Sequence, residues 1–376
     1  MIRIRSVELR EIHLPLVHFF ETSFGRTYNR KIILLTVHSD EGIGYGECTA
    51  SEEPLYSSET TETAWHMLSD FIIPRLMDRD LLSASDAAEV LSPIRGNRMA
   101  KATIETALWD LEARRLGVPL SKHIGGVRTQ IPCGVSIGIQ NSIDELLEKV
   151  RREVSDGYRR VKIKIKPGWE IEPLRAIRAE FPELPLMADA NSAFRLSDTA
   201  LFRRLDELGL MMIEQPLAHD DMVDHAVLQK EMETPICLDE SIHSADDARK
   251  AVELGSCRII NVKLGRVGGF TEALRINDYC ARNRVPIWCG GMLESGVGRA
   301  HNIAMSTLSG FVLPGDVSAS KRYYAEDTIL PPVTVTPEGI IRVLEFPGIG
   351  YELNWERIGR ATMRTRQFTR NRVISD

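Results

Sequence analysis

The sequence lacks the local signatures of several protein classes. Its six cysteines are scattered without a C-x-x-C pair, which argues against a zinc site or a disulfide framework and for a reduced, cytosolic chain. Its nine histidines form no H-E-x-x-H pair and no G-x-S-x-G turn occurs, so hydrolases built on a catalytic triad have little support. No apolar run approaches the ~20 residues of a membrane span, and Met1–Arg5 leads into strand-like sequence instead of a signal peptide. We therefore expect a cytoplasmic, soluble protein.

The charge balance excludes two further kinds of partner. A formal net charge of −6 gives no reason to expect nucleic acid or an anionic membrane. With 43% hydrophobic and 27% charged residues, the composition is that of a globular protein. A chain of 376 residues can hold one large barrel and a smaller companion domain.

Five charged residues recur at an almost constant spacing of 25, 25, 25 and 24 residues: Lys164, Asp189, Glu214, Asp239 and Lys263. Each stands at or near the end of a short apolar run, as expected at the C-terminal end of a buried parallel strand. This spacing is about the length of one strand followed by one helix. In a closed (β/α) barrel such strand ends meet at one mouth, where catalytic groups gather.

The organisation of the whole chain agrees with a barrel. We predict its strands at 131–137, 159–164, 184–189, 210–214, 235–239, 258–263, 285–289 and 311–313. Before them, residues 1–16, 31–38 and 43–48 have the pattern of antiparallel strands, and 57–77 and 99–116 have helical spacing. The fold class is therefore α/β, a modified (β/α)₇β barrel of the TIM type with an α+β capping domain. We place the capping domain at residues 1–127, completed by 323–376, and the barrel at 128–322.

Lysine alternates with β-branched residues from Lys162 to Lys166. On a strand, this places Lys162 and Lys164 on one face and Val161 and Ile163 on the other. An edge strand with solvated lysines would give the same pattern. In a barrel, however, the apolar face meets the helices, so the lysines must point into the mouth. Two buried ammonium groups lower each other's proton affinity, which makes one lysine a usable base.

Asp189, Glu214 and Asp239 predict a divalent cation site. Hard cations such as Mg²⁺ prefer carboxylate oxygens, and three converging carboxylates repel one another unless a cation lies between them. A single strand-end carboxylate is more often a helix cap or a salt-bridge partner. The neighbouring polar residues Asn191, Glu240 and Arg266 are candidates for orienting the carboxylates and Lys263, and capping is the alternative role for the first two.

The chain resembles the enolase superfamily in its muconate-lactonising subgroup, and most closely the o-succinylbenzoate synthase/N-succinylamino acid racemase (N-acylamino acid racemase) family. The lysine pair, the three carboxylates and Lys263 match the subgroup's pattern position by position. Further matching stretches are residues 21–25, 95–100, 166–169, 189–193, 214–217, 236–241, 288–292 and 313–316. The resemblance therefore covers most of the chain.

The resemblance implies an isomerase or lyase that uses Mg²⁺, with Mn²⁺ or another divalent cation as a substitute. Lys164 or Lys263 removes the α-proton of a carboxylate substrate, and Lys162 supports Lys164 and contacts the substrate carboxylate. Racemisation of an N-succinylamino acid uses both lysines as bases. The synthase reaction, a dehydration in menaquinone biosynthesis, uses Lys164 as base and Lys263 as the stabilising cation. A dipeptide epimerase or a muconate-type cycloisomerase is the alternative on the same scaffold, whereas a non-catalytic metal-stabilised binding protein would not need both lysines.

The substrate is expected to be a small carboxylate that carries a succinyl group. Two cap segments, 23–26 and 53–56, are predicted to close over the mouth, with Ser23, Phe24 and Tyr56 as contacts. By resemblance, the backbone near Gly291 and Met292 receives the succinyl group, and we also expect Ser136 to contact the substrate. The resemblance further implies a homo-oligomer, from a dimer to an octamer.

Overall fold

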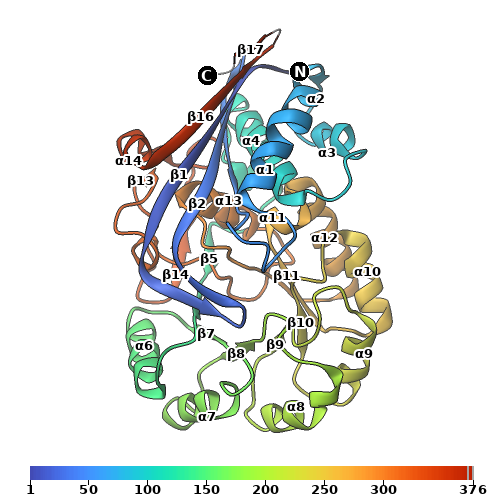
Figure 1. Ribbon diagram of the computed structural model, residues 1–376, viewed down its shortest axis with the longest axis vertical. Helices are drawn as coiled ribbons and strands as arrows, with labels where there is room; N and C mark the ends of the chain where they lie inside the picture. Colours follow the sequence, from blue (N-terminus) through green and yellow to red (C-terminus); the bar gives the residue numbers. More distant parts are fainter. Residues whose placement is uncertain (371, 375–376) are drawn as a thin grey trace.

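The computed structural model describes residues 1–370 and 372–374, and Figure 1 shows an antiparallel sheet standing above a ring of parallel strands and helices. Strand β1 (Ile2–Thr22) pairs along its length with β2 (Gly25–Ser39), and β3 (Gly42–Cys48) extends the meander. The antiparallel hairpin predicted at 31–48 is confirmed. Its strands are longer than predicted, because β1 and β2 continue to a tight turn at residues 22–25.

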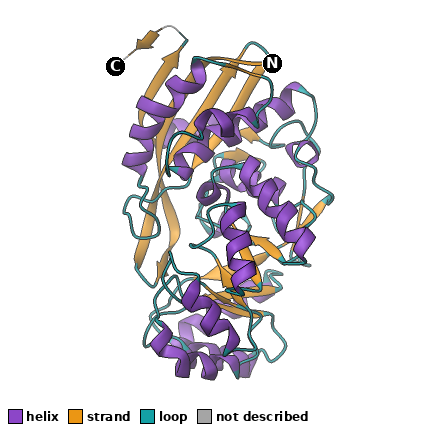
Figure 2. Ribbon diagram, turned by 90° about the vertical axis from the view of Figure 1, so that its right-hand side faces the viewer, coloured by secondary structure: helices purple, strands orange, loops and turns teal. Residues whose placement is uncertain are grey.

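Helices cover one face of this sheet, as Figure 2 shows. They are α1 (Thr61–Met67), a π-helical turn (Leu68–Ile72), α2 (Ile73–Met77), α3 (Asp86–Leu91), α4 (Arg98–Arg115) and α5 (Leu120–His123), with the short strand β4 (Asp80–Leu81) between α2 and α3. The helix predicted at 99–116 is confirmed as α4. The one predicted at 57–77 begins later, because Thr60 caps α1 by accepting a hydrogen bond from the Thr63 N–H.

The barrel sheet contains seven parallel strands in the order β12-β11-β10-β9-β8-β7-β6. They are β6 (Gly134–Ile137), β7 (Arg160–Lys164), β8 (Leu186–Asp189), β9 (Ile213–Glu214), β10 (Ile236–Leu238), β11 (Ile259–Val262) and β12 (Ile287–Cys289). The surrounding helices are α6 (Ile143–Ser155), α7 (Ile171–Glu180), α8 (Thr199–Asp206), α9 (Val223–Lys230), α10 (Ala245–Leu254), α11 (Leu264–Val267), α12 (Phe270–Asn283) and α13 (Gly296–Met305). The predicted enolase-type barrel with an antiparallel cap is therefore confirmed.

Two predicted strands differ from the structure. Residues 131–137 divide into β5 (Gln130–Pro132), which pairs with β14 (Ile340–Arg342), and β6. Residues 311–313 form no regular strand; only the bridges Ile287–Phe311 and Cys133–Gly315 close the ring there. Pro314 lies between these bridges and has no N–H to donate, so a continuous ladder cannot form.

The C-terminal part of the chain returns to the cap. Strand β16 (Thr362–Thr369) pairs with β1 and β17 (Arg372–Ile374) pairs with β16. The remaining elements are β13 (Ile329–Leu330), β15 (Glu352–Leu353), α14 (Trp355–Ala361) and two short 3₁₀ turns at Leu196–Asp198 and Ser320–Arg322. Residues 371 and 375–376 of the predicted segment 323–376 lie outside the described residues. The domain boundaries at 127/128 and 322/323 stay a proposal.

Buried carboxylates fasten the cap to the barrel. Glu105 of α4 accepts hydrogen bonds from the N–H groups of Phe270 (2.7 Å) and Thr271 (2.8 Å), the first turn of α12. Glu47 of β3 accepts from the N–H groups of Ser295 (2.9 Å) and Gly298 (2.8 Å) at the start of α13. A carboxylate is favoured at a helix N-terminus because the first N–H groups there lack partners within the helix. These contacts hold the cap in position over the strand ends.

Two sequence expectations can be compared directly with the structure. Among residues 1–370 and 372–374, none of the helices combines the length and the apolar character that crossing a membrane requires. All six cysteines are buried and free, in agreement with the expected absence of disulfides: Cys48, Cys133, Cys237, Cys257, Cys280 and Cys289.

The contact between β3 and α4 gives a test of the fold. A Cβ atom added at Gly46 would lie 1.9 Å from the Thr103 carbonyl oxygen, so we expect Gly46→Ala to force the helix away from the sheet. The expected loss of stability is about 2 kcal/mol or more. Gly359→Ala in the exposed helix α14 is the control, because nothing lies within 4 Å of its added Cβ. Urea unfolding should show a lower midpoint for the first variant only; equal midpoints would show that the sheet and helix are not in close contact.

Candidate active site

The register of the parallel strands brings the predicted site residues to one edge of the barrel. Lys164 stands opposite Asp189, and Asp189 stands opposite Glu214. Asp239 and Lys263 directly follow β10 and β11. Because neighbouring residues in a parallel sheet point to the same side, all five side chains face the barrel interior. The strand order places Lys164 and Lys263 at the two ends of an arc whose middle is formed by the carboxylates.

The three lysines bond directly to the three carboxylates. The ammonium of Lys164 lies 2.6 Å from Asp189 Oδ2, and that of Lys263 lies 2.7 Å from Asp239 Oδ2. Lys162 lies between two carboxylates, 3.1 Å from Asp189 Oδ2 and 2.9 Å from Glu214 Oε2. The carboxylates are fully buried, so each charge is balanced by a partner inside the protein and not by water.

The proton affinities of the lysines differ. Burial lowers the pKa of Lys164, and the positive charges of Lys162 and Lys263 add to this against the opposing charge of Asp189. Burial also opposes the charge of Lys162, but Asp316, Glu214 and Asp189 outweigh it and raise that pKa. The pKa of Lys263 is likewise raised, by Tyr56 and Glu214 against the effect of burial. Lys164 is therefore the lysine that gives up its proton most readily in this arrangement.

An apolar layer closes the barrel beneath these charges. Met187, Met212 and Cys237 each stand two residues before a carboxylate of the arc, and they pack with Ile259 and Trp288. The alternation of a strand places them on the same inner face, one level deeper. The Lys162 ammonium lies 4.9 Å from the centre of the Trp288 ring, within cation–π range. This layer keeps water away from the charged mouth on the barrel side.

The predicted neighbours of the arc lie next to it. Asn191 accepts a hydrogen bond from the Lys164 ammonium (2.8 Å) and donates one to Glu240 (3.0 Å). Burial raises the pKa of Glu240 to about 7. Arg266 contacts Asp239 and donates to the Ile242 carbonyl (2.7 Å). Arg266 therefore acts on Lys263 through their shared partner Asp239.

Three further residues in the site were not predicted. Asp316 contacts both Lys162 (2.6 Å) and Arg160 (2.6 Å), and Asn261 donates to Glu214 (2.6 Å). Arg160 and Asn261 stand two residues before Lys162 and Lys263, so strand alternation could have identified them. Strand alternation gives no signal for Asp316, because the segment that carries it is not a regular strand; only the matching stretch 313–316 contains this residue.

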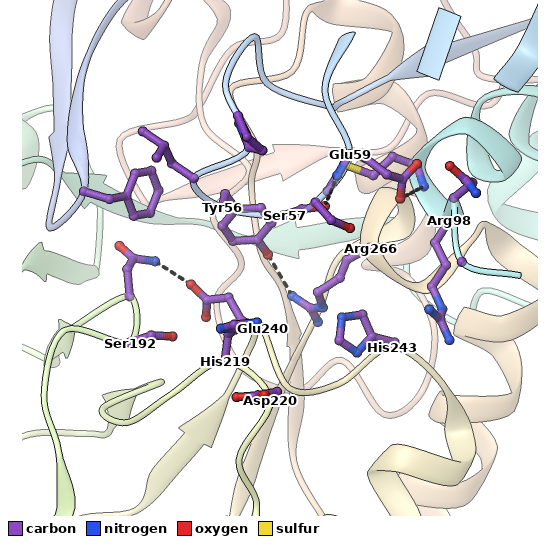
Figure 3. A pocket seen from close by; sticks show the side chains of 18 residues that line it. Tyr56, Ser57, Glu59, Arg98, Ser192, His219, Asp220, Glu240, His243 and Arg266 are labelled. Atoms are coloured by element: carbon purple, nitrogen blue, oxygen red, sulfur yellow. Dashed lines mark hydrogen bonds between the residues drawn. The ribbon is translucent and has the colours of Figure 1, made fainter. Parts of the chain in front are cut away.

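Two cap segments reach the mouth of the barrel. The Ser23 hydroxyl donates to the Asn191 carbonyl (3.2 Å). The Tyr56 hydroxyl donates to Asp239 Oδ1 (3.0 Å) and accepts from Lys263 (3.1 Å) and Arg266 (3.3 Å). Phe24 and Tyr56 line a cavity of about 490 Å³ between the cap and the barrel loops, where Figure 3 shows Tyr56 above Glu240 and beside Arg266.

The other predicted substrate contacts lie away from this cavity. Ser136 of β6 stands beside Lys162 in the sheet register, and its buried hydroxyl has no hydrogen-bond partner among the described residues. Gly291 and Met292 follow β12, and the Met292 N–H donates to Glu294 (2.9 Å). The structure therefore brings Phe24 and Tyr56 to one cavity and bonds Ser23 to Asn191, which also lines it, but leaves Ser136, Gly291 and Met292 outside the lining.

The three carboxylates of the arc determine whether a divalent cation can bind here. In the described part of the chain no group of three or more His, Cys, Asp or Glu side chains is arranged as a ready metal site, since lysines lie between the acids. The donors are nevertheless hard carboxylate oxygens, and one cation, the Lys162 ammonium, already joins Asp189 to Glu214. Burial and the charge of Asp189 raise the pKa of Glu214, so further positive charge beside this carboxylate would stabilise its ionised form. The residues fit a Mg²⁺-type ion.

Comparison with known families and proteins places the chain among well-defined relatives. Residues 4–125 match the family "Mandelate racemase / muconate lactonizing enzyme, N-terminal domain", and residues 145–357 match "Enolase C-terminal domain-like". The o-succinylbenzoate synthase of Geobacillus kaustophilus is 54% identical over 98% of this chain and 98% of its own. The N-succinylamino acid racemase of Thermus thermophilus is 49% identical over 96% of this chain and 98% of its own.

Solved structures agree with these matches. An enolase superfamily protein from Listeria innocua superposes with a TM-score of 0.95 at 43% identity, over 99% of this chain and 100% of that one. A dipeptide epimerase from Cytophaga hutchinsonii, solved with Mg and D-Ala-L-Val, has the same fold with a TM-score of 0.89 at 24% identity, over 98% and 100%.

Asp316 provides a test of the charge balance. Asp316→Asn would leave Arg160 and Lys162, both buried, without their shared anion, which should cost roughly 3–5 kcal/mol of stability. Asp156→Asn is the control, because Asp156 pairs with Lys321 at the surface, where side-chain exposures are 40% and 74%, and such pairs contribute about 1 kcal/mol or less. Urea unfolding compares the two. Similar losses would mean that Asp316 does not balance the buried cations.

Proposed function

Since the chain belongs to the mandelate racemase/muconate lactonizing enzyme family of the enolase superfamily, we propose that it forms o-succinylbenzoate and also racemises N-succinylamino acids. Relatives named for each activity align with nearly the whole chain. One observation carries the proposal: Lys164 and Lys263 flank the buried carboxylates from two different strands. A substrate α-carbon between them can lose its proton to one lysine, and the resulting planar carbanion can gain a proton from the other.

Racemisation uses the two lysines symmetrically. One lysine removes the α-proton of the substrate, and the protonated lysine on the opposite side returns a proton to the other face. Asn191 and Asp189 position the Lys164 ammonium, and Asp239 and Tyr56 position that of Lys263. Lys162 keeps its charge because three acids surround it, so it supplies a fixed positive charge beside Lys164.

Synthesis of o-succinylbenzoate uses the same lysines unequally. Lys164, whose pKa is lowered by burial, removes the α-proton. Lys263, whose pKa is raised, stays charged and stabilises the negative charge that develops on the substrate. The substrate hydroxyl then takes the proton held by Lys164 and leaves as water. The apolar layer below the site and the cap above it, with Phe24 and Tyr56, limit the access of bulk water to the intermediate.

Asp189, Glu214 and Asp239 would hold a divalent cation of the Mg²⁺ type. When bound, this ion would supply positive charge next to the substrate carboxylate, which lowers the energy of the enediolate. Arg266, Asn191 and Glu240 would then orient the carboxylates and the nearby lysines. The Mg in the epimerase of the same fold supports this choice of metal. The expected homo-oligomer stays a prediction.

Metal removal tests the role of the carboxylates. After chelation, with loss of metal verified by elemental analysis, we expect activity to fall by more than roughly 100-fold and to return with Mg²⁺ or Mn²⁺. Asp239→Asn should lose most activity while its circular dichroism spectrum stays that of the wild type. Full turnover by verified metal-free protein would contradict the assignment.

The two lysines can be separated by isotope exchange. In deuterated water, Lys164→Ala should lose α-proton exchange with one enantiomer of an N-succinylamino acid, and Lys263→Ala with the other, each by roughly 100- to 10,000-fold. Racemisation and o-succinylbenzoate synthesis should fail in both variants. Lys166→Ala is the matched control, because the Lys166 ammonium bonds to Glu21 of the cap (2.9 Å) and not to the carboxylate arc. A wild-type rate of racemisation in either active-site variant would rule out the two-base mechanism.

A further inference from the structure

The cavity above the active site continues beyond Tyr56 to an outer corner that has no role in the reaction described above. This corner is formed by Arg98 at the start of α4, His243 in the loop after β10, and His219 in the loop after β9. Figure 3 shows Arg98, His243 and Arg266 on the same side of the cavity. The corner therefore joins the cap to two barrel loops.

Arg98 is a half-buried guanidinium without a partner. In residues 1–370 and 372–374, no hydrogen bond or ion pair of its side chain is found, although it carries five donors. Its stem lies along the barrel loop, since a Cβ atom at Gly268 would be 3.9 Å from the Cβ and Cγ of Arg98. Arg266, by contrast, has its donors engaged by Asp239, Ile242 and Tyr56.

His243 lies in the electrostatic field of Arg98. Burial lowers the pKa of His243, and the charge of Arg98 lowers it further against the opposing charge of Asp247, with a smaller contribution from His219. His243 Nδ1 lies 3.9 Å from Asp247 Oδ2, which orients the ring. No partner of its Nε2 atom occurs among the described residues. The corner thus presents the donors of a guanidinium and one edge of an imidazole to the cavity.

The acids that line the cavity make no hydrogen bond to the Arg98 guanidinium in the described part of the chain, although Glu59 interacts with its charge. Glu59 accepts hydrogen bonds from the N–H groups of Met99 (2.9 Å) and Ala100 (3.1 Å) and so caps α4. Glu240 bonds to Asn191 through Oε1, and its buried Oε2 has no partner among the described residues. Asp220 is exposed at the rim of the cavity. The donors of the Arg98 guanidinium therefore remain available to an anionic ligand.

The corner is connected to the reacting centre through hydrogen bonds of Arg266. Arg266 links the two, because it bonds to Tyr56 above Lys263 and to the carbonyl of Ile242, the residue before His243. We propose that Arg98, together with His243, is a subsite for a carboxylate at the far end of the substrate's amino-acid side chain. The guanidinium binds a carboxylate through two parallel hydrogen bonds, which a neutral group of the same size cannot accept equally well. This inference rests on the proposed racemase function and adds acidic N-succinylamino acids to its substrates.

Titration calorimetry on the Mg²⁺-loaded protein tests the subsite without requiring turnover. The ligands are N-succinylglutamate and N-succinylglutamine, which match in size and differ in the side-chain charge. We expect the wild type to bind the glutamate derivative roughly tenfold more tightly. Arg98→Gln should remove this preference, Arg98→Lys should restore part of it, and His243→Gln should reduce it. The same changes should appear in the KM values for racemisation, with kcat little altered.

Arg95→Gln is the matched control, because Arg95 is exposed three residues away and does not line the cavity. Equal affinity of the wild type for the two ligands would overturn the subsite, as would equal weakening of both by Arg98→Gln. Failure to bind either ligand would also overturn it, whereas the proposed function would still stand if o-succinylbenzoate were formed. Absence of both synthase and racemase activity, with the binding preference intact, would refute the proposed function and leave the subsite in place.

Discussion

The burial of charge at the mouth of the barrel is the constraint on which the rest of the structure depends. Asp189, Glu214 and Asp239 are fully removed from water, so every carboxylate needs a cation at contact distance. Lys162, Lys164 and Lys263 supply these cations from the neighbouring strands. This arrangement requires an exact strand register, because a shift of one residue would turn each charged side chain toward the helices.

The burial of charge also explains why the barrel and the cap have different roles. The barrel carries the charges on short strands whose positions are determined by the sheet ladder. The cap covers the mouth of the barrel. It is attached to the barrel by Glu47 and Glu105, each of which accepts hydrogen bonds from N–H groups at the N-terminus of a barrel helix. Tyr56 can therefore reach Asp239 and Lys263 from a loop, although it lies 183 and 207 residues away in the sequence.

Much of the fold and of the central site could be predicted from local patterns. The constant spacing of the five charged residues reflects a repeated strand–helix unit, and the alternation around Lys162 and Lys164 reflects the two faces of β7. The same alternation places Arg160 and Asn261 on the inner face of their strands, although neither was predicted to belong to the site. Asp316 had no such signal, because Pro314 and the bridges at Phe311 and Gly315 replace the eighth strand.

The sequence by itself determined which residues face the barrel interior, because the period of a strand is a property of the backbone alone. Only the tertiary structure decided which of them touch and what covers them. Lys162 contacts Asp189, Glu214 and Asp316 at once. These contacts depend on closure of the ring, which brings together segments more than 150 residues apart, as the Arg160–Asp316 pair shows. The outer corner at Arg98 and His243 depends on the docking of the cap onto the barrel loops. Such contacts arise from the packing of whole elements, which no local pattern encodes.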